Sequence, residues 1–334
     1  MVYRSCRIDS AIAPAAWPCK GNLAPSQDFG PPLPHFCRAY GLTLRSDIPL
    51  DGTLAAPAGA FDVDVVEGPV PARADPVEAE TLRWTGNARE LVLHIPRVGR
   101  FHVTDGRRIT YAPVTPGAAD PLGLYVLGSA LGAVLHQRGQ QLLHASCVEL
   151  GGKAVAICGR RGAGKSTTAA MLCRQGARLL TDDVAVFARL DPPWIVPGYP
   201  QAKLTGEALA RIDRDPAQLR PLHGERGKFA VPRAEIFVDQ PLPLHAVMVI
   251  ERSDRATPVM ARMKPAPAIQ ALLRHTYRPH FVMPSQAQRD FAGWGKVVEQ
   301  VPMFELRRPR QGDSTAFVVS AIQQAIATIA ESQA

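Results

Sequence analysis

Apolar and polar positions alternate with a period of two in several short segments of the first third of the chain. These segments are separated by glycine, proline or aspartate and cover residues 37–44, 61–67, 90–95, 100–104 and 108–111. Such alternation predicts strands with one buried face. Asp105-Gly106 predicts a type I′ hairpin turn between the last two, because glycine tolerates the positive φ that this turn demands. We therefore expect a small β-rich N-terminal domain over residues 36–115.

The pattern then changes to a mixture of helical and strand periodicities. Helices are expected over residues 120–137, 166–175, 266–275, 287–299 and 314–330. Strands are expected over residues 142–150, 153–158, 178–180, 184–190, 245–251 and 302–306, with a proline-rich loop over 191–200. Gly151-Gly152 joins the first two of these strands as a hairpin turn. This mixture predicts an α/β domain over residues 116–334.

Residues 1–35 have neither period and are rich in proline, alanine and serine, which predicts a mobile leader. Arg4 and Arg7 are followed by Pro14 and Pro18 without a clean apolar region, so we expect no secretory signal and a cytoplasmic protein. No uninterrupted apolar run approaches the roughly 18 residues that cross a bilayer. The sequence therefore predicts no membrane partner.

Composition and charge limit the kinds of ligand and partner that the protein is expected to bind. Hydrophobic residues make up 46% and charged residues 20%, as in ordinary globular proteins, and the formal net charge is +8. No block of five or more Lys and Arg residues occurs, which favours a generally positive surface around an anion site over a nucleic-acid tract. The six cysteines form no C-x-x-C pair, so neither a zinc site nor a disulfide framework is indicated.

The residues with the most specific chemistry follow the strand at 153–158, where the chain reads G-x-x-x-x-G-K-S. In this pattern glycines let backbone N–H groups turn around an anion, and the following helix directs its positive N-terminal end at the same anion. A lysine at this position reaches the β- and γ-phosphates of a nucleotide, and the serine hydroxyl binds Mg²⁺. The predicted ATP-binding residues are Gly159, Arg160, Arg161, Gly162, Ala163, Gly164, Lys165, Ser166 and Thr167. A glycine-rich turn without a ligand is the alternative.

Acidic and imidazole groups flank this loop. Asp182-Asp183 ends an apolar stretch about one helix after the loop, where a carboxylate can bind the metal or take a proton. A turn or a helix cap is the alternative role for such a pair. His144 lies on the strand before the loop, and the hairpin at Gly151-Gly152 would bring it level with the phosphates. A core histidine is the alternative there.

These residues together resemble a known family. His144, the G-x-x-x-x-G-K-S loop and Leu180-Thr181-Asp182-Asp183-Val184 are similar to the catalytic domain of HPr kinase/phosphorylase, a bacterial P-loop serine kinase. Three further segments, 40–50, 197–200 and 277–279, resemble the HPr-kinase-related proteins found with lasso-peptide biosynthesis genes. The resemblance covers about residues 36–310. It implies a P-loop kinase core of the HPr kinase/PEP carboxykinase type, with ATP and Mg²⁺ as cofactors.

The resemblance also implies roles for single residues. Asp183 matches the proton acceptor for the substrate hydroxyl, His144 the catalytic histidine and Lys165 the phosphate grip. Ser166 matches a Mg²⁺ ligand, with Asp182 beside the metal. The family's Glu-Ile-Arg-Gly segment and its arginine-bearing phosphorolysis segment are absent. The resemblance therefore extends to the forward kinase reaction and not to the reverse, pyrophosphate-forming reaction.

Several basic residues are candidates for contact with phosphate or substrate. Arg160 and Arg161 lie in the loop, Arg274 and Arg278 lie near a later helix, and Lys203 and Lys228 are weaker candidates. An ordinary solvated side chain is the alternative at each.

The leading hypothesis is a kinase that phosphorylates a serine hydroxyl of a peptide or small protein, by resemblance the C-terminal serine of a lasso-peptide precursor. The alternatives are an HPr-type protein serine kinase, a small-molecule kinase and a non-catalytic ATP-binding regulatory protein. The resemblance is also compatible with a homo-oligomer.

Overall fold

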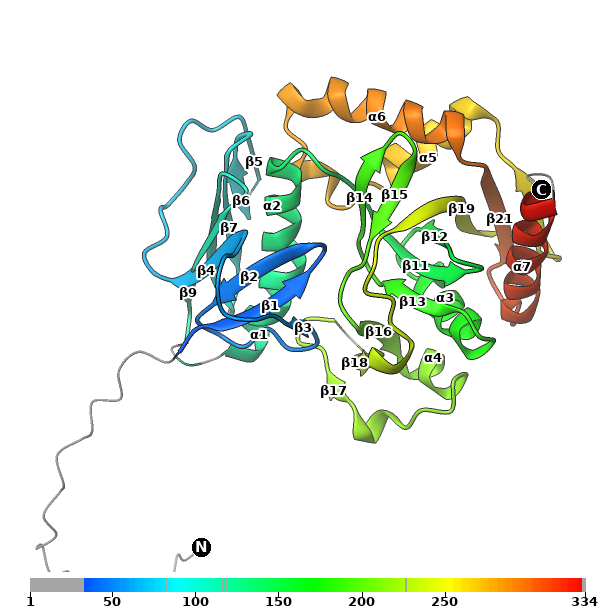
Figure 1. Ribbon diagram of the computed structural model, residues 1–334, viewed down its shortest axis with the longest axis horizontal. Helices are drawn as coiled ribbons and strands as arrows, with labels where there is room; N and C mark the ends of the chain where they lie inside the picture. The colour runs from blue at the N-terminus through cyan, green and yellow to red at the C-terminus, as the bar shows by residue number, and fades with distance from the viewer. Residues whose placement is uncertain (1–32, 82, 116, 118, 226, 332–334) are drawn as a thin grey trace, which may run out of the picture. The chain divides into compact units, whose positions relative to one another are not determined.

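The computed structural model describes residues 33–331, except residues 82, 116, 118 and 226. Residues 1–32 of the predicted leader lie outside the described residues. The described chain from Pro34 onward belongs to one compact unit of mixed helices and strands (Figure 1), which agrees with the predicted α/β class. Within the described residues, no helix has both the length and the apolar character needed to span a bilayer.

The first sheet has nine strands in the order β3-β1-β2-β4-β9-β8-β7-β6-β5. Its strands are β1 (His35–Ala39), β2 (Leu42–Ser46), β3 (Leu54–Ala55), β4 (Val63–Glu67), β5 (Ala79–Thr81), β6 (Trp84–Gly86), β7 (Glu90–Ile95), β8 (Gly99–Thr104) and β9 (Arg108–Pro113). The predicted hairpin between β8 and β9 is confirmed, with Asp105 at φ +52° and Gly106 at φ +61°. Both residues thus adopt the positive φ of a type I′ turn.

The single strand expected over residues 37–44 is wrong, because the chain reverses in its middle. Tyr40 (φ +54°) and Gly41 (φ +73°) form a tight turn, and β1 and β2 pair in antiparallel register across it. Alternation of apolar residues continues on both sides of the turn, so the pattern alone hides the reversal. A two-residue turn of this kind matches the twist of its flanking strands.

The helix predicted over residues 120–137 packs on this first sheet. It consists of α1 (Ala119–Tyr125), the π-helical turn η1 (Val126–Ala130) and α2 (Leu131–Gln137). Helix α2 lies beside the strands of the first sheet (Figure 1), and its Leu131 and Leu135 share a hydrophobic core with Phe101 and Tyr111 of the sheet. The division of the chain near residue 115 remains a prediction, and this helix shares its core with the strands that precede that division.

The second sheet contains the strand that leads to the glycine-rich loop. Its strands are β10 (Gln141–Leu143), β11 (Ala145–Leu150), β12 (Lys153–Gly159), β13 (Arg178–Thr181), β14 (Ala185–Leu190), β15 (Pro193–Val196), β19 (Leu242–Ser253), β20 (Val259–Arg262) and β21 (Met303–Pro309). β19 pairs in parallel with both β12 and β21. The carboxyl ends of these three strands therefore meet at one edge, where ligands bind in open α/β sheets.

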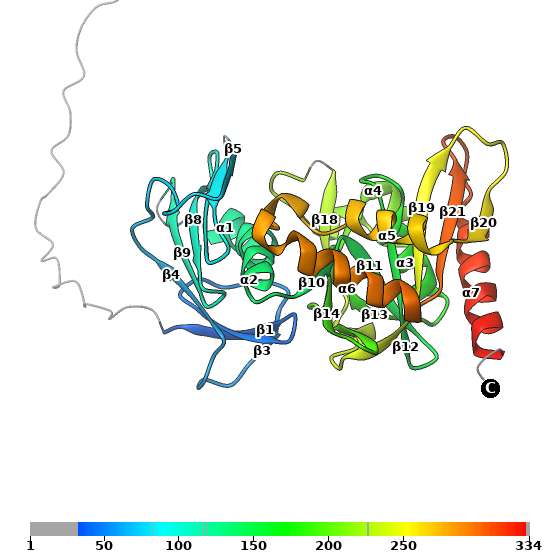
Figure 2. The ribbon, with the colours of Figure 1, turned by 90° about the horizontal axis from the view of Figure 1, so that it is seen from above.

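Helices cover both faces of this second sheet. They are α3 (Lys165–Arg174), α5 (Pro265–Arg274), α6 (Ala287–Gln300) and α7 (Thr315–Glu331). Along β12, Ala154, Ala156 and Cys158 belong to the core under α5 and α6, whereas Val155 and Ile157 belong to the core under α3 and α7 (Figure 2). Because neighbouring side chains of a strand point to opposite faces, a nearly continuous apolar run is required here.

Two expectations for this sheet are wrong. The strand predicted over residues 142–150 is broken at His144, whose backbone N–H donates to the carbonyl of His275 at 2.7 Å. As a result β10 pairs with β14, whereas β11 pairs with β12 and β13. The predicted loop over residues 191–200 contains β15, which pairs with β14 and β19. Its proline lies at the first position of the strand, where a missing N–H is tolerated.

A small third sheet lies in the segment 201–244, for which the pattern made no prediction. It contains β16 (Gln201–Thr205), β17 (Arg220–Pro221) and β18 (Lys228–Pro232). The short helix α4 (Gly206–Ala210) and the 3₁₀ turns η2 (Pro216–Gln218) and η3 (Ala234–Ile236) lie between or after these strands. The 3₁₀ turns η4 (Pro279–Phe281) and η5 (Pro284–Gln286) connect α5 to α6.

Candidate active site

The glycine-rich loop joins β12 to α3, as the motif predicts. Gly159, Gly162 and Gly164 adopt φ of +153°, +79° and +106°, which residues with a side chain rarely adopt. A Cβ on Gly159 would lie 2.4 Å from the carbonyl oxygen of Ile250, so the close approach of the loop to β19 also requires glycine. Helix α3 begins at Lys165, and Thr167 lies half-buried in its first turn. The loop therefore precedes the positive end of a helix, as an anion site requires.

Lys165 is held inside this loop. Its Nζ donates to the carbonyl oxygen of Gly159 at 3.0 Å, and only 7% of the residue is exposed. Burial lowers the pKa of Lys165, an effect that the nearby carboxylates of Asp183 and Asp182 oppose. The ammonium group has no ion pair within 4.0 Å among the described residues, so a bound anion would satisfy it.

Oxygen ligands gather beside Ser166. The Ser146 hydroxyl lies 3.5 Å from the Ser166 hydroxyl and donates to Asp182 Oδ1 at 2.5 Å. Asp182 Oδ2 accepts from the backbone N–H of Lys203 at 2.8 Å, which fixes the carboxylate. Hydroxyl and carboxylate oxygens suit Mg²⁺, which takes one or two protein ligands and completes its shell with phosphates and water. The residues present therefore fit the metal, although no cluster of three or more His, Cys, Asp or Glu side chains occurs among the described residues.

Asp183 lies between two basic side chains. Its Oδ2 accepts from Lys203 Nζ at 2.8 Å, and its Oδ1 lies 3.2 Å from His144 Nδ1. The same ring nitrogen lies 2.8 Å from the backbone carbonyl of Asp183. Asp183 adopts φ +75°, which is a strained conformation for a residue with a side chain. Strain of this kind persists where surrounding contacts over-determine the residue, and it clusters at functional sites.

The charges of Asp183 and Lys203 stabilise each other. Burial alone would raise the pKa of Asp183, but Lys203 and His144 outweigh it and hold that pKa well below its usual value. Burial opposes the charge of Lys203 as well, and the carboxylate of Asp183 raises the Lys203 pKa well above its usual value. Asp183 is therefore ionised at neutral pH, with only 18% of its side chain exposed.

The hairpin prediction for His144 is confirmed. β11 pairs with β12 in antiparallel register, with Ala145 opposite Cys158, so His144 lies level with Gly159. The Gly151-Gly152 turn has φ of +60° and +78°. His144 consequently meets Asp183 beside the loop, although the residues are 39 positions apart.

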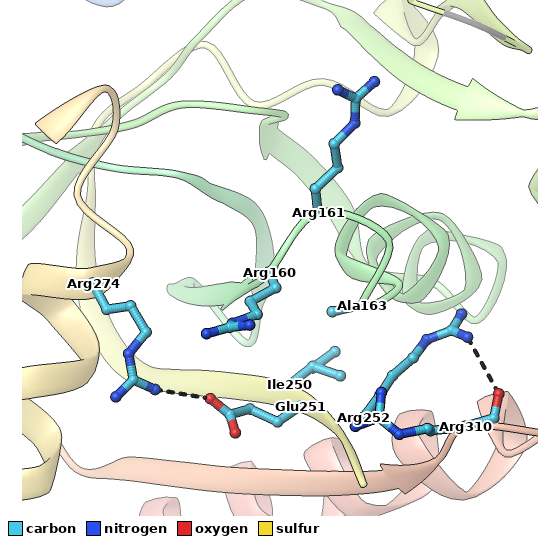
Figure 3. Close-up of a pocket in the computed structure, with 8 residues that line it drawn as sticks. All are labelled: Arg160, Arg161, Ala163, Ile250, Glu251, Arg252, Arg274 and Arg310. Atoms are coloured by element: carbon cyan, nitrogen blue, oxygen red, sulfur yellow. Dashed lines mark hydrogen bonds and ion pairs between the residues drawn. The ribbon is translucent and has the colours of Figure 1, made fainter. Parts of the chain in front are cut away.

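The candidate arginines line two cavities that share residues of the loop. A cavity of about 350 Å³ beside the loop is lined by Arg160, Arg161, Ala163, Ile250, Glu251, Arg252, Arg274 and Arg310. Figure 3 shows Arg160 extending toward Arg274, whereas Arg161 points away from them. Arg274 pairs with Glu251 at 3.3 Å, and Arg161, 79% exposed, lies 3.7 Å from Glu225. This cavity is strongly cationic and lies over the carboxyl end of β19.

Arg278 and Lys228 belong to the other side of the loop. Arg278 lies against a cavity that also contains Asp183 and His144, and its guanidinium stacks over the Tyr277 ring at 5.5 Å. Lys228 pairs with Glu225 at 2.9 Å. Arg274 lines this cavity as well as the first one, and Lys228 has an acidic partner already.

Three residues of the site, Ser146, His275 and Arg308, belong to no sequence motif. A fourth, Lys203, is predicted only as a weaker candidate for contact with phosphate or substrate. The His275 ring is 5% exposed, its Nε2 has no partner, and burial with the charges of Lys165 and Arg274 lowers its pKa to about 4. Arg308 Nη1 would lie 2.8 Å from a Cβ on Gly164. Only the period-two pattern of β11 and β21 could have placed Ser146 and Arg308 in the sheet.

Comparison with solved structures of known proteins finds structural similarity. The chain is similar to the structure of the Hpr(Ser) kinase/phosphatase from Coxiella burnetii, with a TM-score of 0.33 and 10% sequence identity. The similarity covers 58% of this chain and 94% of that chain. No family model matches the chain, and no curated protein matches it.

Proposed function

We propose that this protein is a kinase that transfers the γ-phosphoryl group of ATP to a hydroxyl. The observation that carries this proposal is the ionised carboxylate of Asp183, held in a strained conformation by Lys203 and His144 beside a glycine-rich loop. A loop of this type binds phosphates. A fixed carboxylate next to it is the group that a phosphoryl acceptor needs.

In the proposed reaction the nucleotide lies along the glycine-rich loop. Its phosphates lie against the loop amides and the first turn of α3, where Lys165 neutralises charge. The nucleoside lies in the arginine-lined cavity, because that cavity adjoins the loop at the carboxyl ends of β19 and β21. Asp183 lies in the other cavity at the loop, of about 690 Å³. The acceptor therefore reaches Asp183 through this second cavity.

Asp183 orients the acceptor hydroxyl and receives its proton as the phosphoryl group moves. Its lowered pKa keeps the carboxylate ionised and ready to accept a hydrogen bond. The transition state of phosphoryl transfer is loose, so the hydroxyl proton leaves late and a strong base is not required. His144 and Lys203 hold both carboxylate oxygens, which reduces the entropy lost on reaching the reactive geometry.

Ser166 and Asp182 are the residues that would hold Mg²⁺. When bound, the ion would neutralise phosphate charge and orient the transferring group. Ser146 positions Asp182 for this role through its hydroxyl. We further propose that the acceptor is a serine of a peptide or small protein, and the sequence resemblance favours the C-terminal serine of a lasso-peptide precursor.

A single substitution tests the proposed role of Asp183. Asp183→Asn preserves size but cannot take a proton, so it should lower label transfer from γ-labelled ATP to a serine peptide by about a thousand-fold. Nucleotide binding, measured by calorimetry, should change by less than about ten-fold. Unchanged transfer would remove Asp183 from the mechanism. Tight ATP binding by wild-type protein without transfer to any hydroxyl would favour a non-catalytic ATP-binding protein.

A further inference from the structure

The groove on the acceptor side of Asp183 extends beyond the loop to the first sheet. It has a volume of about 850 Å³, and its lining includes Asp183, Arg278 and Phe281 together with Arg83, Trp84 and Ile95. It shares Asp183, Tyr277 and Arg278 with the cavity at the loop. A group that reaches Asp183 from this side therefore passes along β6 and the end of β7.

Direct contacts join the two walls of this groove. The Trp84 ring on β6 lies 5.7 Å from the Phe281 ring in an edge-to-face arrangement and 5.8 Å from the His280 ring. Trp84 and Phe281 are both buried in the core that contains the first sheet. Aromatic contacts of this kind fix the relative position of two segments. The groove thus has a fixed aromatic base between a strand of the first sheet and the turn η4.

The carboxylates that line the groove have charged partners, but two of its arginines do not. Both of its carboxylates have cationic partners: Asp183 pairs with Lys203, and Glu225 pairs with Lys228 at 2.9 Å. Of its three arginines, Arg161 lies 3.7 Å from Glu225, whereas Arg83 and Arg278 have no carboxylate partner within 4.0 Å among the described residues. Arg278 also adopts φ +45°, a strained conformation, and its Nε has no hydrogen-bond partner. The groove therefore presents two uncompensated guanidinium groups to whatever enters it.

We propose that this groove binds an acidic segment of the peptide next to the accepted hydroxyl, and that the first sheet acts as a wall that selects the acceptor. This inference rests on the proposed kinase function and assigns the substrate class of the same site. Arg278 binds a carboxylate near the hydroxyl, and Arg83 binds one farther along the peptide. Ile95 and Phe281 provide apolar contact for side chains between them, because a site of this kind combines apolar lining with a few placed charges.

A pair of peptides tests the groove without nucleotide. The probes are the fluorescein-labelled hexapeptides Asp-Phe-Gly-Ser-Gly-Asp and Asn-Phe-Gly-Ser-Gly-Asn, both with an amidated C-terminus. Fluorescence anisotropy should show the acidic probe binding wild-type protein at least ten-fold more tightly than the neutral probe. Equal affinity for the two probes would overturn the proposal, as would tighter binding of a small dicarboxylate such as succinate in competition.

Substitutions of the groove arginines test whether the preference for the acidic probe arises in the groove. Arg83→Gln and Arg278→Gln should each weaken the acidic probe about five-fold, the size expected for partly exposed charge pairs. Arg107→Gln is the matched control, because Arg107 is exposed in the turn between β8 and β9 of the same sheet and lies outside the groove. Equal weakening by the control would show a general charge effect and contradict the proposal.

Label transfer from γ-labelled ATP to the same probes separates this proposal from the kinase function. Binding that depends on Arg83 without any transfer would refute the kinase and leave the groove standing. Transfer that is equal for both probes and insensitive to Arg83→Gln would leave the kinase standing and refute the groove.

Discussion

Lys203 controls the charge balance of the candidate site. Its side chain is 8% exposed, and its ammonium group lies 2.8 Å from the Asp183 carboxylate. Two buried charges of this kind stabilise the fold only while both are present, because removing one leaves the other without compensation. The pair therefore links the stability of the fold to the state of the proposed catalytic group.

A double-mutant cycle measures this link. Lys203→Met should lower the free energy of unfolding by about 3 kcal/mol, because the Asp183 charge loses its main partner. Asp183→Asn combined with Lys203→Met should recover part of that loss, so the two changes are not additive. Urea unfolding of the four proteins checks this expectation. Additive effects would show that the two side chains do not interact.

His275 makes the stability of the folded protein depend on pH. Its pKa is about 4 in the folded protein, against about 6.5 for a free histidine. Between these values the folded state binds fewer protons than the unfolded state, so stability is full above pH 6.5 and falls as pH drops toward 4. His275→Gln should remove this loss of stability, which amounts to about 1–2 kcal/mol at pH 5.

Urea unfolding at pH 7 and pH 5 measures the His275 effect. The wild-type protein should lose more stability between these values than His275→Gln does. An equal loss in both proteins would contradict the burial of a neutral imidazole at this position.

The residues that could be predicted from the sequence are those in contiguous motifs. Lys165, Ser166 and Asp183 stand at positions whose chemistry follows from a glycine-rich loop and a strand end. Lys203 could not be ranked correctly, since it reaches Asp183 from β16, which lies 20 positions later and has no motif of its own. Contacts made by tertiary folding leave no local signal of this kind.

At the scale of elements, the glycine-rich loop depends on two different properties of glycine. Gly159 requires both its φ and the close approach of the Ile250 carbonyl, whereas Gly162 requires only its φ because nothing lies within 4 Å of its Cβ position. Gly162→Ala should therefore cost about 1 kcal/mol of stability, the penalty for a left-handed residue.

Gly159→Ala should cost more stability than Gly162→Ala and should also abolish nucleotide binding, because β12 or β19 must move. Urea unfolding and calorimetric titration with ATP check the pair. Equal costs for the two substitutions would show that the contact with Ile250 does not restrain the loop.

Most elements could be predicted where one periodicity continues without interruption. The helices α3, α5, α6 and α7 and the strands β12 and β19 lie within a few residues of their expected positions. The reversal at Tyr40-Gly41 and the break at His144 could not be predicted, because the apolar pattern continues across both. Backbone hydrogen bonds to distant segments decide these breaks, as the His275 carbonyl does for His144.

At the scale of the whole molecule, the first sheet and the site share a hydrophobic core. Val184 and Tyr277, which lie next to the site residues Asp183 and Arg278, belong to the same core cluster as Phe101 and Tyr111. The α/β class could be predicted from the sequence, but this shared core could not, since it depends on how separate segments pack. A ligand bound at the site should therefore stabilise the first sheet as well as the glycine-rich loop.

Ligand binding should raise the melting temperature of the whole protein. A ligand at a hundred times its Kd stabilises the folded state by about 2.7 kcal/mol. Differential scanning fluorimetry should show this shift with ATP and Mg²⁺, and a smaller shift when EDTA removes the metal. Lys165→Met is the control, because it deletes the ammonium group held in the loop. A shift of the same size in this variant would place the nucleotide elsewhere.

The most direct test of the proposed kinase is to follow which phosphate moves. Purified wild-type protein is incubated with Mg²⁺ and a serine peptide, once with γ-labelled ATP and once with α-labelled ATP, and the label on the peptide is measured. Phosphoryl transfer guided by Asp183 should place the γ-label on the serine and leave the α-label in solution. Transfer of the α-label, or no label on any hydroxyl acceptor while ATP binds, would contradict the proposed function.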